Sequence, residues 1–248
     1  MARIVVVGAG AAGLMAAGFA AKRHEVVLVE RNARVGRKLM ITGKGRCNVT
    51  NNCGLDAFLS NVPVNPRFLY SALSQFGPAD AIAFFEGLGV PLKTERGRRV
   101  FPVSDKAVDI VDALAHFAAP AERCTGRVRD LLLQDGAAVG VLLENGREIH
   151  ADAVILCTGG ASYPATGSTG DGYRLAEEAG HTVVAPHASL VPMVTEEEWP
   201  ARAMGLSLRN VTLTVSSRDG KAVFSELGEM LFTHFGVSGP LVLAASSH

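Results

Sequence analysis

The chain has 248 residues, of which 48% are hydrophobic and 19% are charged, with 24 basic and 24 acidic side chains. This composition can bury a sizeable core, which excludes intrinsically disordered and collagen-like proteins. The zero formal net charge offers no overall electrostatic attraction to phosphates, so we expect no nucleic-acid partner.

The first 30 residues predict a strand, a glycine turn, a helix and a second strand. Residues 3–7 are mostly β-branched and suit a buried parallel strand, and the alanine-rich segment from about Ala11 to Lys22 suits a helix. Residues 4–21 carry no charge, as in a signal peptide or a short membrane span, but four glycines interrupt them. We therefore expect no membrane association and a cytoplasmic protein.

The turn itself, Gly8-Ala9-Gly10-Ala11-Ala12-Gly13, has the G-x-G-x-x-G spacing of dinucleotide-binding proteins. In such turns the first two glycines let a diphosphate approach the backbone, and the third lets the helix pack on the strand. Glu30 ends the second predicted strand, Val26–Glu30, where a carboxylate can accept hydrogen bonds from ribose hydroxyls. The sequence therefore predicts an FAD or NAD site, with a purely structural βαβ unit as the alternative.

The middle of the chain alternates between irregular and helical patterns. Residues 36–52 read as a long loop without periodicity, and such loops are commonly functional. Apolar residues at helical spacing predict two helices within Pro66–Leu88, divided at Pro78, and a third helix at Val108–Phe117.

Three short apolar runs joined by turns predict an antiparallel meander at Arg127–Leu133, Ala138–Glu144 and Glu148–His150. A buried strand, Ala153–Cys157, then leads into Thr158-Gly159-Gly160. Gly167–Gly172 precedes a predicted helix from about Tyr173 to Ala179, so Asp171 is either its N-cap or a functional residue.

Beyond Pro186 the pattern changes to alternating strands, Leu206–Ser216 and Ala222–Ser225, joined by a turn. We therefore predict two domains, residues 1–186 and residues 187–248. None of the four cysteines forms a C-x2-C pair, so we expect reduced thiols and no metal site.

Several segments carry a family resemblance. The glycine at position 36, six residues after Glu30, resembles the extended fingerprint of FAD-binding folds of the glutathione-reductase and fumarate-reductase type. Four blocks in chain order resemble the BaiN/YhiN-like NAD(P)/FAD-dependent oxidoreductases, some of them aminoacetone-oxidase-type flavoproteins. These blocks are Gly36–Asn51, Gly97–Pro102, Thr158–Tyr173 (with its two glycine clusters) and Gly228–Pro240.

The resemblance implies a Rossmann-like α/β fold that binds FAD in residues 1–186, followed by the start of an inserted β-rich substrate or cap domain. It implies an FAD-dependent oxidoreductase that transfers a hydride between flavin and a small organic substrate or NAD(P)H, the latter a transient reductant. Nothing after Pro240 matches the family's return segment, so we expect the C-terminal third to be lacking. The alternatives are a truncated, non-catalytic FAD- or nucleotide-binding protein and a tRNA-modifying flavoprotein.

Combining the motifs with the resemblance gives a set of expected site residues. Cys47 is either a partner of the flavin or a small packing residue, and His234 is the candidate acid–base residue of the second domain. The expected cofactor-binding residues are Gly8, Ala9, Gly10, Ala11, Ala12, Gly13, Glu30, Arg31, Gly36, Arg37, Lys38, Thr42, Gly43, Gly45, Arg46, Cys47, Asn48, Thr50, Val128, Thr158, Gly159 and Gly160.

Overall fold

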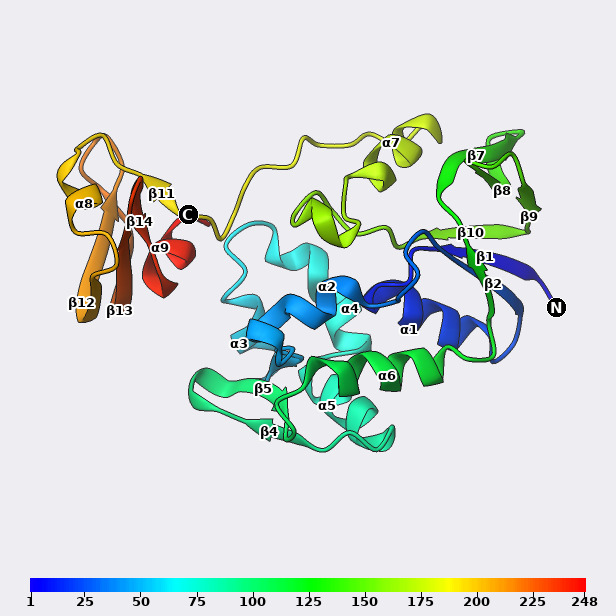
Figure 1. Cartoon of the computed structure of the whole chain (residues 1–248), viewed down its shortest axis with the longest axis horizontal. Helices are drawn as coiled ribbons and strands as arrows, with labels where there is room; N and C mark the ends of the chain where they lie inside the picture. Colours follow the sequence, from blue (N-terminus) through cyan, green and yellow to red (C-terminus); the bar gives the residue numbers. More distant parts are fainter. The chain divides into compact units, whose positions relative to one another are not determined.

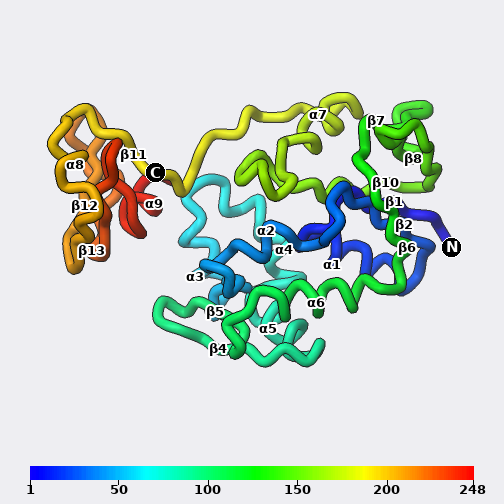
Figure 2. The backbone as a smooth tube through the Cα atoms, viewed as in Figure 1, coloured from blue at the N-terminus to red at the C-terminus, as the bar shows by residue number.

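The computed structural model describes residues 1–248 and divides them into two compact units (Figure 1, Figure 2). Unit 1 comprises residues 1–61 and 67–183, and unit 2 comprises residues 62–66 and 184–248. The sequence did not predict that residues 62–66 group with unit 2. The assignment of residues 1–186 to cofactor binding and of 187–248 to an inserted domain stays a prediction.

Unit 1 is built on a four-stranded parallel sheet with the strand order β10-β1-β2-β6. The strands are β1 (Arg3–Val7), β2 (Glu25–Glu30), β6 (Glu122–Thr125) and β10 (Ala153–Leu156). Parallel strands joined through helices require a sheet covered on both faces, which is why β1 and β2 are almost continuously apolar. The predicted Rossmann-like α/β fold is confirmed. Strand β6 was not predicted, because this short edge strand begins with the charged residues Glu122 and Arg123 and has no apolar run that would indicate a strand.

Two helices cover one face of the sheet. Helix α1 (Ala11–Ala20) ends two residues before the predicted end at Lys22, and α6 (Ala107–Phe117) begins one residue before its predicted start. Their side chains Leu14 and Leu114, each 1% exposed, belong to one hydrophobic core with Val6 and Leu28 of the strands.

The opposite face packs against the meander β7 (Val128–Gln134), β8 (Ala137–Leu143) and β9 (Glu148–His150), whose antiparallel pairing confirms the prediction. Because side chains alternate along a strand, Val5, Val7, Val27 and Val29 point to this side, opposite to Val6 and Leu28. Leu175 of α7 (Asp171–Glu178) completes this second core.

The expectation of an irregular loop at residues 36–52 is wrong in part. This segment forms α2 (Arg37–Ile41), a 3-10 turn η1 (Thr42–Gly45) and β3 (Thr50–Asn51). Strand β3 pairs with β5 (Arg99–Pro102), which pairs with β4 (Leu92–Thr94), to make a small antiparallel sheet. Elements of two to five residues show no readable periodicity, and these form through contacts with distant segments.

The remaining helical elements of unit 1 are short. The predicted division at Pro78 is confirmed, since a helix begins at this residue. The elements are α3 (Leu55–Leu59), η2 (Pro66–Leu69, whose first residue is grouped with unit 2), α4 (Tyr70–Gln75), α5 (Pro78–Gly87), η3 (Arg96–Arg98) and η4 (Pro164–Thr166).

Unit 2 is an antiparallel sheet with the order β11-β14-β13-β12, carrying α8 (Trp199–Arg202) and α9 (Pro240–Ala245). The strands are β11 (Met193–Val194), β12 (Ser207–Ser216), β13 (Ala222–Thr233) and β14 (Gly236–Ser238). Helix α9 packs on β13, and Leu241, Ala245 and Phe224 form the core. Strand β13 continues eight residues beyond the predicted end at Ser225.

No helix in either unit combines the length and the apolar character that crossing a bilayer requires.

The two faces of α6 give a stability test. Leu114 is 1% exposed, so Leu114→Ala should leave a cavity and lower the free energy of unfolding by about 2–5 kcal/mol. Val108, on the same helix but 37% exposed, is the control, and Val108→Ala should change stability by less than about 0.5 kcal/mol. Urea unfolding followed by circular dichroism measures both values, and equal losses would contradict the placement of α6.

Candidate functional site

A cavity of about 670 Å³ opens at the carboxyl ends of β1, β2 and β10, entirely within unit 1. Its volume lies in the range of small-molecule sites, about 300–1,000 Å³. Open parallel sheets bind ligands at this edge, where the strand order reverses. The walls come from the glycine turn after β1, the segment after β2, the start of β7 and the glycine-rich segment before α7.

The glycine turn has the geometry that its sequence predicts. Gly8 has φ +99°, and its N–H donates to the Val29 carbonyl at 2.7 Å, which locks the turn onto β2. A Cβ atom on Gly13 would lie 1.7 Å from the Gly8 carbonyl oxygen, so no side chain fits between helix and turn. Gly10 is different, because a Cβ there would meet no protein atom within 4 Å. Gly10 lines the cavity at the N-terminus of α1, where unpaired N–H groups favour an anion.

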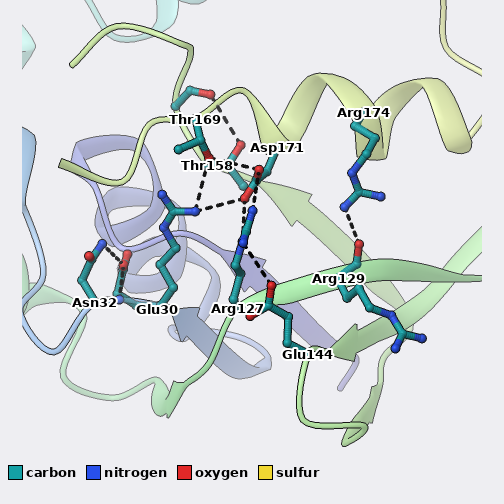
Figure 3. A network of polar contacts seen from close by, with 11 residues as sticks. Glu30, Asn32, Arg127, Arg129, Glu144, Thr158, Thr169, Asp171 and Arg174 are labelled. Atoms are coloured by element: carbon teal, nitrogen blue, oxygen red, sulfur yellow. Dashed lines mark hydrogen bonds and ion pairs between the residues drawn. The ribbon is translucent and has the colours of Figure 1, made fainter. Parts of the chain in front are cut away.

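Glu30 lies in the cavity wall and is fixed by its own backbone surroundings. Its Oε2 accepts the Ala9 N–H at 2.7 Å. Its Oε1 accepts the Asn32 backbone and side-chain N–H groups at 2.8 and 2.6 Å (Figure 3). Because each carboxylate oxygen can accept two hydrogen bonds, Oε2 retains one position for a ligand hydroxyl. Ala9 also accepts the Gly36 N–H at 2.9 Å, so both glycine segments meet beside this carboxylate.

A network of charged side chains centred on Asp171 also lies in the wall of this cavity (Figure 3). Its carboxylate accepts two hydrogen bonds from Arg127, both at 3.1 Å, one from Arg31 at 3.1 Å and one from Thr169 at 3.0 Å. Arg127 also pairs with Glu144 at 3.0 Å. The network therefore joins the end of β2, the start of β7 and the start of α7.

The N-cap interpretation of Asp171 is wrong. The helix begins at Asp171, Gly170 is its N-cap, and no side chain caps it. The hydrogen bonds from Arg127 lower the pKa of Asp171 most, and burial, the next-largest effect, raises it. The hydrogen bond from Thr169 and the charges of Arg127 and Arg31 lower it further, so the pKa of Asp171 lies below its usual range.

The cavity is electropositive as a whole. Arg31, Arg34, Arg37, Lys38 and Arg127 line it, against the carboxylates Glu30 and Asp171. A surplus of guanidinium and ammonium groups next to a helix N-terminus suits a ligand that carries a diphosphate.

The structure brings together most of the residues that the sequence predicted. Arg37 donates to the Asn32 side chain at 2.7 Å, and Lys38 donates to Ser162 at 3.1 Å, so both are held at the rim. The predicted residues that line the cavity are Gly8, Ala9, Gly10, Ala11, Ala12, Glu30, Arg31, Gly36, Arg37, Lys38, Thr42, Val128, Thr158 and Gly159.

The rest of the predicted set does not line the cavity. Arg46 instead pairs with Glu95 at 3.0 Å and Asp105 at 3.2 Å, and its guanidinium lies 4.0 Å from the centre of the Phe101 ring. Cys47 is 2% exposed within the hydrophobic core, and burial raises the pKa of its thiol. The others are Gly13, Gly43, Gly45, Asn48, Thr50 and Gly160; a cofactor role for all of these residues stays a prediction.

His234, the predicted acid–base residue, lies in unit 2, in the turn between β13 and β14, with its ring 4.9 Å from that of Phe235. Its role stays a prediction. Among the cavity residues that the sequence did not indicate are Asn32, Gly126 and Arg127. Arg127 directly precedes Val128, which was predicted to bind the cofactor. Its position next to this residue was the one signal in the sequence that could have indicated a place in the cavity wall.

Comparison with known proteins places this geometry in a family. The family model described as "HI0933-like protein Rossmann domain" matches residues 2–242. The chain is 34% identical over 253 residues to the 3-dehydro-bile acid delta(4,6)-reductase of Clostridium scindens, covering 100% of this chain and 60% of that protein. It is 33% identical over 248 residues to the ribosomal RNA dihydrouridine synthase of Escherichia coli, covering 98% and 60%. The chain thus spans about 60% of the length of these curated relatives.

Solved structures share the fold. A quinol-fumarate reductase superposes with a TM-score of 0.56 at 18% identity, covering 84% of this chain and 44% of that chain. The 3-ketosteroid-delta4-(5alpha)-dehydrogenase of Rhodococcus jostii RHA1 gives a TM-score of 0.50 at 18% identity, covering 65% and 46%.

The Asp171 network predicts a pH-dependent stability difference. Asp171→Asn should lower the free energy of unfolding at pH 7 by on the order of 1 kcal/mol, because several of these ion pairs are partly exposed. A lowered pKa in the folded state means that the charged carboxylate stabilises the fold above its ordinary pKa. The difference between the two proteins should therefore shrink as the pH falls below about 4.

The control is Asp130→Asn, which breaks more exposed ion pairs with Arg129 and Arg174 outside the cavity. It should change stability by less than about 0.5 kcal/mol. Denaturant unfolding at pH 7 and at steps below pH 4 tests both variants. A difference for Asp171→Asn that persists unchanged in acid would contradict the role of its charge.

Proposed function

This chain belongs to the HI0933-like Rossmann-domain family, and from that premise we propose that it forms the FAD-binding part of an oxidoreductase. The reaction proposed is hydride transfer between flavin and an organic substrate or NAD(P)H. The observation that carries the proposal is that two glycine segments, Glu30 and a surplus of cations meet in one cavity.

The residues of the cavity fit FAD on chemical grounds. The open space above Gly10 leaves room for a diphosphate at the N-terminus of α1, where a side chain would intrude. The free acceptor position on Glu30 suits a ribose hydroxyl, and a carboxylate there would repel the 2′-phosphate of an NADP-type nucleotide.

The other cavity residues would position and enclose the cofactor. Arg37 and Lys38 at the rim would offset the diphosphate charge, and the Asp171 network would hold the wall segments together around the nucleotide. Flavin supplies hydride chemistry when bound, and the protein supplies position and electrostatics. His234 in unit 2 is our candidate for proton transfer to or from the substrate.

The names of the relatives support a reductive reaction. A delta(4,6)-reductase and a dihydrouridine synthase both saturate a carbon–carbon double bond, in a bile acid and in ribosomal RNA respectively. We therefore propose reduction of a carbon–carbon double bond, with NAD(P)H as the transient reductant. The two relatives act on substrates of very different size, so a small molecule and an RNA base are both candidates.

A non-catalytic nucleotide-binding protein is the competing function, and reduction kinetics separate the two. The proposed enzyme takes electrons from NADH or NADPH, which bleaches the flavin absorbance in an anaerobic stopped-flow experiment. A chain that binds FAD but is never bleached by either nucleotide would favour the competing function.

Two matched glycine variants test the cofactor site itself. Gly10 and Gly54 both precede a helix in an extended conformation, and neither would bring a Cβ within 4 Å of protein. Gly10→Val should therefore fold as well as Gly54→Val but bind FAD at least about tenfold more weakly, a loss of about 1.4 kcal/mol or more. Equilibrium dialysis and the two-band flavin absorbance measure binding. A wild-type protein that cannot be reconstituted with FAD would refute the proposal, as would equal affinity of the two variants.

A further inference from the structure

The loop between β4 and β5, residues 95–98, and the first residue of β5, Arg99, form a strongly basic segment that lies outside the cofactor cavity, at the periphery of unit 1 (Figure 1). Its side chains Arg96, Arg98 and Arg99 are exposed, and none of them forms an ion pair. The one carboxylate of the loop, Glu95, is already paired with Arg46 at 3.0 Å and Lys93 at 3.5 Å. We call these three arginines the hairpin tip. Its positive charge is not neutralised by the protein.

The backbone of the hairpin tip is strained in a way that favours a functional explanation. Arg98 has φ +58°, a left-handed conformation that glycine or asparagine adopts at much lower cost. Lys44, which is exposed and forms no ion pair, has φ +59° in the turn η1. Glycine would adopt either conformation at lower cost than these long cationic side chains. Persistent strain of this kind is typical of binding sites.

The hairpin tip is also held rigidly. The Asn51 side chain donates to the Gly97 carbonyl at 2.9 Å, and the Asn52 N–H donates to the Arg98 carbonyl at 2.7 Å. Glu95 and Arg99 close the loop with a backbone hydrogen bond of 2.8 Å. A preordered frame loses little backbone entropy when a partner binds.

The chemistry of the hairpin tip points to one class of partner. Guanidinium groups match phosphate oxygens in two-point hydrogen bonds, and the tip carries no large apolar side chain that would insert into a bilayer. The zero net charge of the chain does not oppose this, because charges beyond about 10 Å are screened at 0.1 M salt and a phosphate senses only nearby groups.

We propose that the hairpin tip of Arg96, Arg98 and Arg99 is a docking site for the phosphate backbone of RNA. The proposal rests on the reductase function proposed above, for which it selects RNA as the substrate class. The contacts are to the backbone, so the site positions an RNA without reading its sequence.

The test measures binding of the full chain to a fluorescein-labelled RNA hairpin by anisotropy over a series of KCl concentrations. Arg96→Gln/Arg98→Gly removes two charges of the tip. Arg23→Gln/Arg123→Gln is the control, since both of these arginines are exposed, form no ion pair and lie outside the loop, Arg23 in the turn after α1 and Arg123 in β6. Each lost phosphate contact should weaken binding by up to roughly eightfold near 0.1 M salt and lower the salt slope by about one.

The single variant Arg98→Gly separates binding from folding. Glycine relieves the left-handed strain, so this variant should melt at a higher temperature than the wild type and yet bind the RNA more weakly. A residue with a purely structural role would not give these opposite changes.

Three results would overturn the docking site. They are equal RNA affinity and salt slope in the two double variants, no RNA binding by the wild type, and tip-dependent binding to phosphatidylserine vesicles with RNA binding unaffected by the tip. Flavin content, measured on the same samples, separates the two proposals. A chain that binds no flavin but binds RNA through the tip contradicts the reductase and supports the docking site, whereas a flavin-loaded chain indifferent to the tip contradicts only the docking site.

Discussion

The close approach of α1 to the turn after β1 is the constraint on which unit 1 depends. Gly13 brings the helix so near that a Cβ would lie 1.7 Å from the Gly8 carbonyl oxygen. This contact aims the helix N-terminus at the edge of the sheet and keeps Ala9 within reach of both Glu30 and Gly36. The N–H groups at the N-terminus of α1, the Glu30 carboxylate and the second glycine segment therefore converge because of one missing side chain.

The cavity balances two opposite electrostatic requirements. The diphosphate of the proposed cofactor needs cations, yet Arg31 and Arg127 would repel each other if nothing separated them. Asp171 lies between them and accepts hydrogen bonds from both, so the cations stay close together while the wall segments remain joined. Neutrality of the whole chain and strong local charge are thus compatible, both in the cavity and on the β4–β5 loop.

The sequence predicts local patterns well and distant partnerships poorly. The βαβ unit, the meander and Glu30 are readable because periodicity and glycine spacing report on neighbouring residues. Strand β6 and the small sheet of β3, β4 and β5 are not readable, since their short, charged strands form only through partners far along the chain. The same limit applies to the site, where Arg127 gains its role from Asp171, on another element. The motif that contains Arg46 predicts a cofactor role for it, which stays a prediction, but no sequence pattern indicates its contacts with Glu95, Asp105 and Phe101.

The order of strands in the parallel sheet has a consequence for synthesis on the ribosome. Strand β1 lies inside the sheet, yet one of its neighbours is β10, in which Ala153 pairs with Ile4. This apolar edge of β1 therefore stays unpaired while about 150 further residues are made, a delay of roughly 8–30 seconds at elongation rates of about 5–20 residues per second. An open edge of this kind templates association between nascent chains. Efficient folding would then require that this edge of β1 be kept from contact with other chains until β10 has been synthesised. This requirement is separate from the stability of the folded protein.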